Sequence, residues 1–421
     1  MFYYLSEYLR SLGVPGMGAF GYVSTRAGLA LLFSLFISTI IGKRVIDFLR
    51  SRQMSDDVRD LGLEGMMAKK SVPTMGGLII ICSLLIPTLL FTKLDNVYII
   101  LMVVTSVWLG ALGFTDDYIK VFRKNKEGIH GRYKLIAQLG LGALVAMVML
   151  TSPAVVIKDH AEVFTAGGSR TVEFATTEVQ SLKTTIPFFK NNDLDYGALA
   201  QAVGIGSNSE LFTTIAVTLL FIFIVMAVSN GANLTDGIDG LAAGSSAIIG
   251  VVLGILAYVS SHMQYAAYFN IMFIPGAEEL VIFAAAFIGA TVGFLWYNSY
   301  PAQVFMGDTG SLMLGGVIAV FAIVIRKELL LPILCGIFLV ESLSVIIQTS
   351  YFKITKKKYG AGRRVFKMTP LHHHFQKRGD GSINALIQAP KMALPEAKIT
   401  VRFWLIGIML AALTLITLKL R

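Results

Sequence analysis

The stretch Leu211–Asp239 reads LFTTIAVTLLFIFIVMAVSNGANLTDGID, an almost unbroken apolar run that ends in a connector of Asn, Gly and Asp. Its apolar part, Leu211–Val228, is close to the ~20 residues that a helix needs to cross the hydrocarbon core of a bilayer. No Lys, Arg, Asp or Glu interrupts that part. The stretch therefore predicts a membrane-spanning helix whose exit carries polar, acid-containing chemistry.

The composition of the whole chain supports the same class. Of its 421 residues, 55% are hydrophobic and only 15% are charged, whereas a soluble domain carries about 25% charged residues. A net charge of +10 could indicate a nucleic-acid partner. The Lys and Arg residues lie in the connectors between apolar runs, however, so they favour membrane orientation, and we expect no nucleic-acid partner.

The apolar runs predict an all-α integral membrane protein with about ten transmembrane helices. We expect these spans near Ala27–Val45, Met75–Phe91, Val97–Phe114, Leu135–Ser152, Leu211–Val228, Leu241–Val259, Leu280–Tyr297, Ser311–Ile325, Leu329–Phe352 and Phe403–Leu418.

The distribution of basic residues predicts the orientation of these spans. Lys and Arg are concentrated in the connectors after the first, third and ninth spans, and the even-numbered connectors hold few of them. The positive-inside rule then places the odd-numbered connectors in the cytoplasm and both termini in the periplasm.

The chain divides into four parts on this basis. Residues 1–26 form an N-terminal interfacial segment, and residues 27–152 hold spans one to four. Residues 153–210 are polar and rich in Thr, Ser and Gly, which predicts a periplasmic insertion with short strands around Ser169–Val179. Residues 211–421 hold spans five to ten and the cytoplasmic connectors between them.

The exit of the third span carries adjacent carboxylates, Asp116 and Asp117. Two neighbouring carboxylates stay ionised together only where a cation compensates them, and otherwise the pKa of one rises. Both outcomes suit phosphate chemistry, as a Mg²⁺ site or as a base of tuned pKa. A solvated helix cap remains the alternative for this pair.

The exit of the fifth span holds Asn233, Asp236, Gly237 and Asp239. The two acids are three residues apart and share a face if the segment is helical. These residues suit a metal, or the hydrogen-bonding edge of a base and a ribose. An Asx-rich turn is the alternative.

Three further connectors carry candidate groups. Asp308 follows the seventh span and could cap the eighth span or bind a metal. His372, His373 and His374 follow the ninth span, where they suit phosphate oxygens better than a three-His zinc site, or are simply exposed. Lys69 precedes a Gly-rich stretch after the first span, which suits diphosphate binding or reflects orientation alone.

All five odd-numbered connectors must face the same side of the bilayer. A reaction between a water-soluble anion and a lipid phosphate belongs at such an interface, whereas transport sites more often lie near the bilayer centre. Glu341 is the exception, because it lies within the ninth span, where we expect a structural hydrogen bond to a neighbouring helix rather than a catalytic role.

The motifs resemble those of the phospho-N-acetylmuramoyl-pentapeptide transferase family. The resemblance runs in order from about Lys43 to Arg421, outside the insertion, and the triple His separates this family from the related N-acetylglucosamine-phosphate transferases. The matching stretches are Pro73-Thr-Met-Gly-Gly77, Asp116-Asp117-Tyr-Ile-Lys120, Asn233-Leu-Thr-Asp236-Gly-Ile-Asp239, Pro301-Ala-Gln-Val-Phe-Met-Gly-Asp308, Pro370-Leu-His-His-His-Phe and Ile399-Thr-Val-Arg402-Phe-Trp404.

The resemblance implies a multi-pass enzyme of the bacterial inner membrane. Its reaction would move phospho-N-acetylmuramoyl-pentapeptide from the uridine-diphosphate donor to undecaprenyl phosphate, with Mg²⁺, to form lipid I and release uridine monophosphate (UMP). The resemblance also implies a homodimer. The rival hypotheses are a uridine-diphosphate N-acetylglucosamine donor on the same carrier, a cation transporter, and a non-catalytic scaffold.

The resemblance also implies roles for individual residues. Asp308 would be the Mg²⁺ ligand, and Asp116 would be the base that deprotonates the lipid phosphate, with Asp117 beside it. Those expected to bind the donor at its uridine and nucleotide are Asn233, Asp236, Gly237, Asp239 and Phe305. Those expected to engage phosphate or sugar are Lys69, Lys134, His372 and His373.

Overall fold

A computed structural model of the chain describes residues 1–52, 72–125, 127–164, 170–189, 193–202, 209–381 and 383–419. Within these residues, nine helices are long and apolar enough to cross a membrane, which makes this a multi-pass membrane protein. They are α2 (Val23–Ser51), α5 (Val97–Phe122), α6 (Gly131–Thr151), α8 (Ser209–Thr235), α9 (Leu241–Ser260), α11 (Glu278–Asn298), α12 (Gly307–Val324), α14 (Gly336–Tyr359) and α16 (Glu396–Thr417).

The second predicted span is a shorter apolar helix, α4 (Gly77–Phe91). Its 15 residues give a length of about 22 Å. The preceding turn pairs with a distant loop, because the N–H groups of Gly76 and Gly77 donate to the carbonyls of Phe305 and Met306 at 2.8 Å. The start of α4 is thereby fixed beside the start of α12.

The prediction of one continuous helix from Leu329 to Phe352 is wrong at its beginning. A short 3-10 helix, η3 (Glu328–Leu330), and α13 (Leu331–Leu334) come first, and α14 begins after Cys335. Pro332 sits in the first turn of α13, where its missing N–H is tolerated, so the chain can restart a helix there. The periodicity of apolar residues alone did not reveal this interruption.

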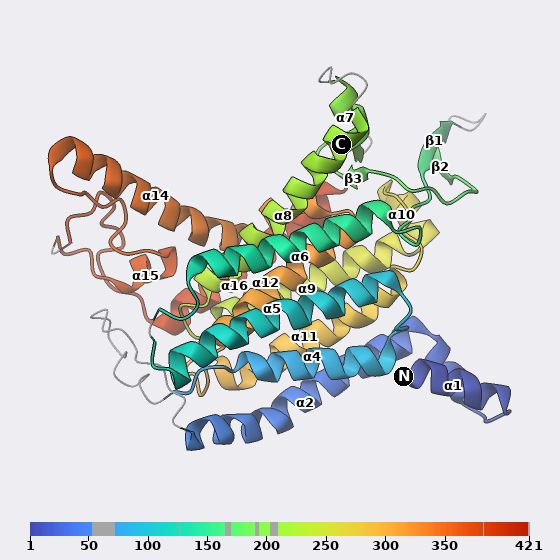
Figure 1. Cartoon of the computed structure of the whole chain (residues 1–421), viewed down its shortest axis with the longest axis horizontal. Coiled ribbons are helices and arrows are strands. Elements are labelled where there is room, and N and C mark those ends of the chain that lie inside the picture. Colours follow the sequence, from blue (N-terminus) through green and yellow to red (C-terminus); the bar gives the residue numbers. More distant parts are fainter. Residues whose placement is uncertain are drawn as a thin grey trace.

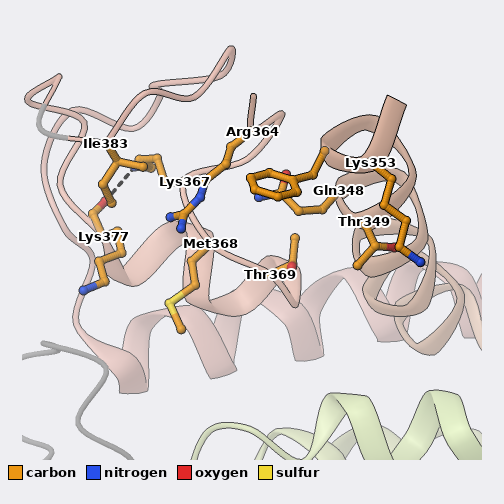
Figure 2. A pocket seen from close by; sticks show the side chains of 10 residues that line it. Gln348, Thr349, Lys353, Arg364, Lys367, Met368, Thr369, Lys377 and Ile383 are labelled. Carbon is orange, nitrogen blue, oxygen red and sulfur yellow. Dashed lines mark hydrogen bonds between the residues drawn. The ribbon is translucent and has the colours of Figure 1, made fainter. Parts of the chain in front are cut away.

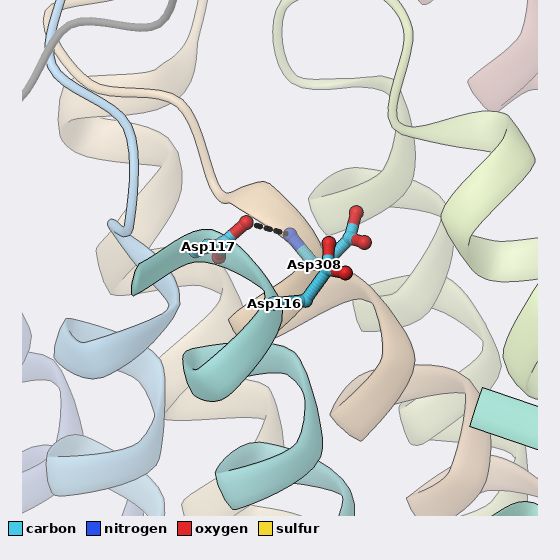
Figure 3. Close-up of side chains that lie close together, drawn as sticks. All are labelled: Asp116, Asp117 and Asp308. Atoms are coloured by element: carbon cyan, nitrogen blue, oxygen red, sulfur yellow. Dashed lines mark hydrogen bonds between the residues drawn. The ribbon is translucent and has the colours of Figure 1, made fainter. Parts of the chain in front are cut away.

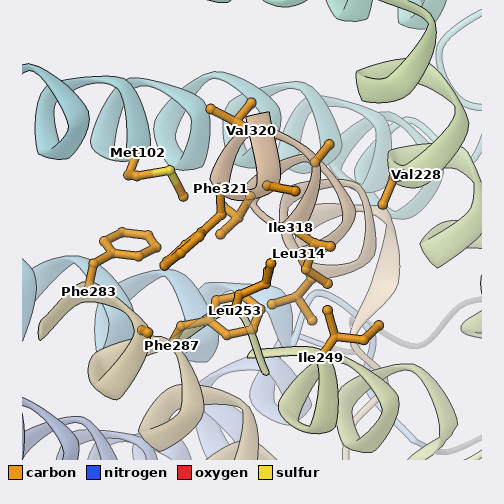
Figure 4. Close-up of a cluster of buried hydrophobic side chains, with 14 of the residues drawn as sticks. Met102, Val228, Ile249, Leu253, Phe283, Phe287, Leu314, Ile318, Val320 and Phe321 are labelled. Carbon is orange, nitrogen blue, oxygen red and sulfur yellow. The ribbon is translucent and has the colours of Figure 1, made fainter. Parts of the chain in front are cut away.

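The centre of the bundle is α12, the shortest of the nine helices. Its residues from Thr309 to Val324 are all buried. A helix that is apolar on every face belongs in the interior, and α12 packs against α4, α5, α8 and α9. Figure 4 shows Phe321 and Ile318 of α12 among Met102 of α5, Leu253 of α9 and Phe283 of α11.

Two polar groups tie the N-terminal part of the chain to the bundle. The terminal ammonium donates to the carbonyls of Leu89 and Leu90 at 2.9 and 3.0 Å, so α1 (Phe2–Ser11) starts at the end of α4. Arg26, in the first turn of α2, makes a buried bidentate pair with Glu279 at 2.7 and 2.8 Å. The interfacial position of residues 1–26 remains a prediction.

The described part of residues 153–210 contains two small antiparallel pairs of strands. The strand β1 (His160–Phe164) pairs with β2 (Arg170–Phe174). Of the two, β2 lies in the region around Ser169–Val179 where strands were predicted, and β1 lies before it. The strand β3 (Lys183–Thr185) pairs with β4 (Asp193–Asp195), and α7 (Tyr196–Ala202) follows. β3 packs on the segment after α12. The N–H of Thr185 donates to the carbonyl of Arg326, and the ammonium of Lys327 donates to the Thr185 hydroxyl at 2.7 Å.

The bundle has two different ends (Figure 1). One carries α1, β1 and β2, together with α10 (Met263–Phe269), and the chain also ends on that side. The opposite end carries the C-terminal turns of α2 and α5, the start of α12 and the short helix α15 (Leu371–Gln376). The acidic and histidine connectors gather at this second end.

Candidate active site

The C-terminal part of α5 crosses the beginning of α12, and three carboxylates meet there (Figure 3). Gly113 makes this close approach possible, because a Cβ atom at that position would overlap the carbonyl of Asp308. Asp116, Asp117 and Asp308 offer ligand atoms that all lie within 4.8 Å of one another, so this group could bind a metal ion. The structure therefore brings together the acids of the third and seventh connectors, as the parity of the spans predicted.

Asp117 caps the N-terminus of α12. Its Oδ1 accepts the N–H of Asp308 at 3.1 Å, and its Oδ2 accepts both the N–H of Thr309 at 2.9 Å and the Thr309 hydroxyl at 2.6 Å. A carboxylate at a helix N-terminus satisfies orphan N–H groups and is stabilised by the helix dipole. The alternative that Asp308 itself caps this helix is wrong, because the capping carboxylate comes from α5.

Asp116 and Asp308 face each other across two lysines. Lys120 lies 2.6 Å from Oδ2 of Asp116 and 3.2 Å from Oδ2 of Asp308. Lys134, at the start of α6, lies 3.0 and 2.5 Å from the same two oxygens. The N–H of Ile129 donates to the other oxygen of Asp116 at 2.7 Å. The two ammonium groups thus compensate the charges of Asp116, which is buried, and of Asp308, which is half-buried.

The donor set fits a hard divalent cation. Mg²⁺ is usually held by one or two carboxylates together with water and substrate phosphates. Both oxygens of Asp117 accept hydrogen bonds from the start of α12. The oxygens of Asp116 and Asp308 that a cation could use are instead the two Oδ2 atoms that now face the lysines. A cation there would share the space with the ammonium groups of Lys120 and Lys134, which can turn toward a phosphate instead.

The loop after α8 borders this cluster. The side chain of Asn233 accepts the hydroxyl of Ser311, on the second turn of α12, at 3.0 Å. Burial, with the negative charges of Asp308, Asp117 and Asp239, raises the pKa of Asp236 well above its usual range. Asn233 and Asp236 thus lie beside the acidic cluster, and their role in binding the donor remains a prediction.

Asp239 links the same loop to neighbouring segments through hydrogen bonds. Its Oδ2 accepts the N–H of Ala302 at 3.0 Å, and its carbonyl accepts the Thr400 hydroxyl at 3.0 Å. Its own N–H donates to Glu396 at 2.8 Å. These contacts join the fifth connector to the seventh connector and to α16. The predicted role of Asp239 in binding the donor remains a prediction.

His372 lies directly over Gly237. A Cβ atom at Gly237 would overlap Nε2 of His372, so only glycine allows this packing. His372 is fully buried, and Glu341 of α14 accepts its backbone N–H at 3.2 Å and lies 3.3 Å from its Nδ1. Glu341 therefore makes the interhelical hydrogen bond that the sequence predicted, and it supports one of the candidate phosphate-binding residues.

The other two histidines differ from His372 in their surroundings. His373 is half-buried and its Nδ1 lies 2.6 Å from Oε1 of Gln376. His374 is held between two backbone groups, since its Nδ1 accepts the N–H of Lys367 at 3.1 Å and its Nε2 donates to the carbonyl of Ala389 at 2.7 Å. Burial lowers the pKa of His374. Its two contacts with backbone groups give His374 a structural role in the loop.

The first connector reaches the site through its last residues. The carbonyl of Pro73 accepts the N–H of Phe305 at 2.8 Å, and Phe305 is half-buried beside Met306. Lys69 lies outside the described residues. The position of the Pro73–Gly77 motif beside α12 agrees with the prediction that the first and seventh connectors converge.

Lys120 is a residue of the cluster that the sequence reading did not select. The signal was present, because Lys120 follows Asp116 by four residues on a helix and therefore shares its face. Thr309 and the N–H of Ile129 had no comparable signal, since their roles depend on contacts between distant segments.

Comparison with known proteins shows the family of the chain. The model of glycosyl transferase family 4 matches residues 99–326, more than half of the chain. The chain is 65% identical to a phospho-N-acetylmuramoyl-pentapeptide-transferase of Parabacteroides distasonis, 61% identical to one of Porphyromonas gingivalis and 55% identical to one of Bacteroides thetaiotaomicron. Each of these comparisons covers 100% of both chains. The chain therefore belongs to glycosyl transferase family 4 and, within it, to the phospho-N-acetylmuramoyl-pentapeptide transferases.

Proposed function

We propose that this chain transfers phospho-N-acetylmuramoyl-pentapeptide from its uridine-diphosphate derivative to undecaprenyl phosphate in a Mg²⁺-dependent reaction. The product is lipid I, an intermediate of peptidoglycan synthesis, and UMP leaves. The observation that carries the proposal is the pairing of Asp116 and Asp308 across Lys120 and Lys134 at one end of an apolar bundle. Full-length similarity to transferases of this name supports the choice of substrates.

In the proposed reaction an oxygen of the lipid phosphate forms a bond to the β-phosphorus of the donor. The bond from that phosphorus to the bridging oxygen breaks, and UMP departs with this oxygen. Such transfers depend on positioning and charge neutralisation more than on covalent help from the protein.

Each residue of the cluster would have a different role in this reaction. Asp308 would hold Mg²⁺, which supplies charge neutralisation on the diphosphate and on the departing UMP. Asp116 would accept the last proton of the lipid phosphate. Asp117 would fix the backbone of Asp308 through the α12 cap, and Lys120 and Lys134 would bind phosphate oxygens.

The remaining site residues would bind the donor away from the reacting phosphorus. Asn233, Asp236, Gly237, Asp239 and Phe305 would line the uridine and nucleotide site, and His372, His373 and Lys69 would engage phosphate or sugar. We place the enzyme in the bacterial inner membrane, with ten spans if α4 is counted, periplasmic termini and a cytoplasmic active site. A homodimer is the expected assembly.

The test is UMP release by the purified protein in neutral detergent with undecaprenyl phosphate. We expect release to require Mg²⁺, and we expect Asp308→Ala and Asp116→Asn to lose at least about 10²-fold in rate while their thermal unfolding stays cooperative. Wild-type rates in either variant would remove that residue from the mechanism. A parallel assay with the N-acetylglucosamine donor separates the nearest alternative, since faster turnover of that donor would reject the proposed substrate.

A further inference from the structure

A second, basic cavity lies beside the active site, between α14 and the loop that follows it. Its volume is about 510 Å³, within the size range of small-ligand sites. Four of the residues that line it are cationic: Lys353, Arg364, Lys367 and Lys377. None of the described residues lining it is acidic. Such a lining selects for an anion.

Hydrogen bonds hold both walls of the cavity in place. Gln348 of α14 accepts the N–H groups of Val365 and Phe366 at 2.9 and 3.0 Å, which fixes the loop against the helix. On the far wall, the ammonium of Lys367 donates to the carbonyls of Lys377 and Pro390 at 2.6 and 2.7 Å. The ammonium of Lys367 therefore stabilises the conformation of the loop.

Of the three other cations, Lys353 and Arg364 are the candidates for binding a ligand. The backbone of Arg364 is fixed, because its carbonyl accepts the N–H of Leu386 at 2.9 Å. Among the described residues, neither Lys353 nor Arg364 has an acidic partner for its side chain. In Figure 2, Lys353 and Gln348 stand on α14 at one side, Lys377 stands on the loop at the other, and Arg364 lies between them.

The cavity is close to the candidate active site. Thr369, which lines it, precedes His372 by three residues, a separation of at most about 11 Å. Gln348 follows Glu341 by seven residues on α14, which is two turns along nearly the same face and about 10.5 Å. Glu341 contacts His372, and Gln348 on the same helix lines the cavity. The cavity therefore lies near His372.

We propose that this cavity binds the carboxylates of the donor's peptide, through Arg364 and Lys353. The inference rests on the proposed function, in which the donor carries a pentapeptide on its muramoyl group. A peptide joined through its amino end leaves at least its terminal carboxylate free. Five extended residues span up to about 17 Å, enough to reach the cavity from a sugar held near His372. Guanidinium and ammonium groups are the natural partners of such carboxylates.

The experiment compares two donors on the purified full-length enzyme in neutral detergent. One donor has the native peptide, and in the other the peptide carboxylates are converted to amides. We expect the wild-type KM for the amidated donor to be about tenfold higher, with kcat within about twofold. The Arg364→Gln/Lys353→Gln variant should show this higher KM with both donors, and Arg364→Lys should recover part of the difference.

The matched control is Lys357→Gln, an exposed lysine one turn further along α14 that does not line the cavity, and it should keep the wild-type ratio. An equal KM for both donors in the wild type, or a cavity variant that still distinguishes them tenfold, would overturn the inference. So would a dependence on added anionic phospholipid that Arg364→Gln abolishes with both donors, because a lipid headgroup would then occupy the cavity. Absence of UMP release from the wild type would overturn the proposed function itself, which separates the two failures.

Discussion

Asp117 and Thr309 are joined by two hydrogen bonds to a single oxygen, since Oδ2 of Asp117 accepts the backbone N–H of Thr309 at 2.9 Å and its hydroxyl at 2.6 Å. The residues lie on different helices, α5 and α12. Through this contact one carboxylate of the pair Asp116–Asp117 becomes a helix cap, and the other is left to face Asp308. Two adjacent acids of the same type thus have different positions in the site.

The first prediction concerns this cap. Thr309→Val removes the hydroxyl and leaves Asp117 buried with one hydrogen bond fewer, so we expect about 1–2 kcal/mol less stability and a reduced kcat with little change in KM. Thermal unfolding in detergent and UMP release measure the two effects. Thr309→Ser keeps the hydroxyl and is the control. Unchanged stability and rate in Thr309→Val would show that the backbone N–H groups alone position Asp117.

The second prediction concerns the ammonium groups between Asp116 and Asp308. Lys120→Met removes one of two compensating charges, so the free enzyme should bind a divalent cation more tightly, by several-fold. Paramagnetic resonance of Mn²⁺ can measure this binding without turnover. UMP release should fall by about tenfold or more, because a phosphate ligand is lost at the same time. Lys120→Arg retains the charge and should keep the wild-type Mn²⁺ affinity; an unchanged affinity in Lys120→Met would contradict the electrostatic account.

The third prediction concerns the packing of His372 on Gly237. Gly237→Ala should displace the imidazole and lower the rate of transfer by about as much as His372→Ala does. The double variant should be no worse than either single variant, because both remove the same arrangement. Gly131→Ala is the control, since a Cβ there meets nothing within 4 Å. Additive losses in the double variant would show that the two residues act independently.

The fourth prediction concerns pH and the docking of the insertion. Burial raises the pKa of Asp193 to about 6, above the ordinary value of 3.8. The folded state therefore binds this proton more tightly than the unfolded chain, so the contribution of Asp193 to stability falls as pH rises from about 4 to about 6. Asp193→Asn removes this dependence. The melting temperature of the wild type minus that of the variant should decrease across this window and become constant above about pH 7.

The same melting series with Asp47→Asn, at an exposed carboxylate on α2, controls for the loss of one charge. A constant difference between wild type and Asp193→Asn from pH 4 to 7 would show that the carboxylate of Asp193 is hydrated in solution.

The sequence by itself determined the membrane class and the approximate place of the apolar spans. A run of about 20 apolar residues has few alternatives in a bilayer, because every backbone polar group must be satisfied within the segment. The parity of the spans also predicted that the acids after the third and seventh spans would meet. The exception is the start of α14, where the local break at Cys335 lies within an apolar stretch and leaves the hydropathy unchanged.

Only the tertiary structure decided what each polar residue does. Asp117 and Asp308 are 191 residues apart, and Lys134 and Asp308 are 174 apart, so no local pattern could show which carboxylate caps α12 and which ones share the lysines. The same holds for Gly237 beneath His372. Hydropathy specifies where a segment lies relative to the bilayer, whereas hydrogen bonds and ion pairs between segments depend on how the helices pack, and that packing is a property of the whole chain.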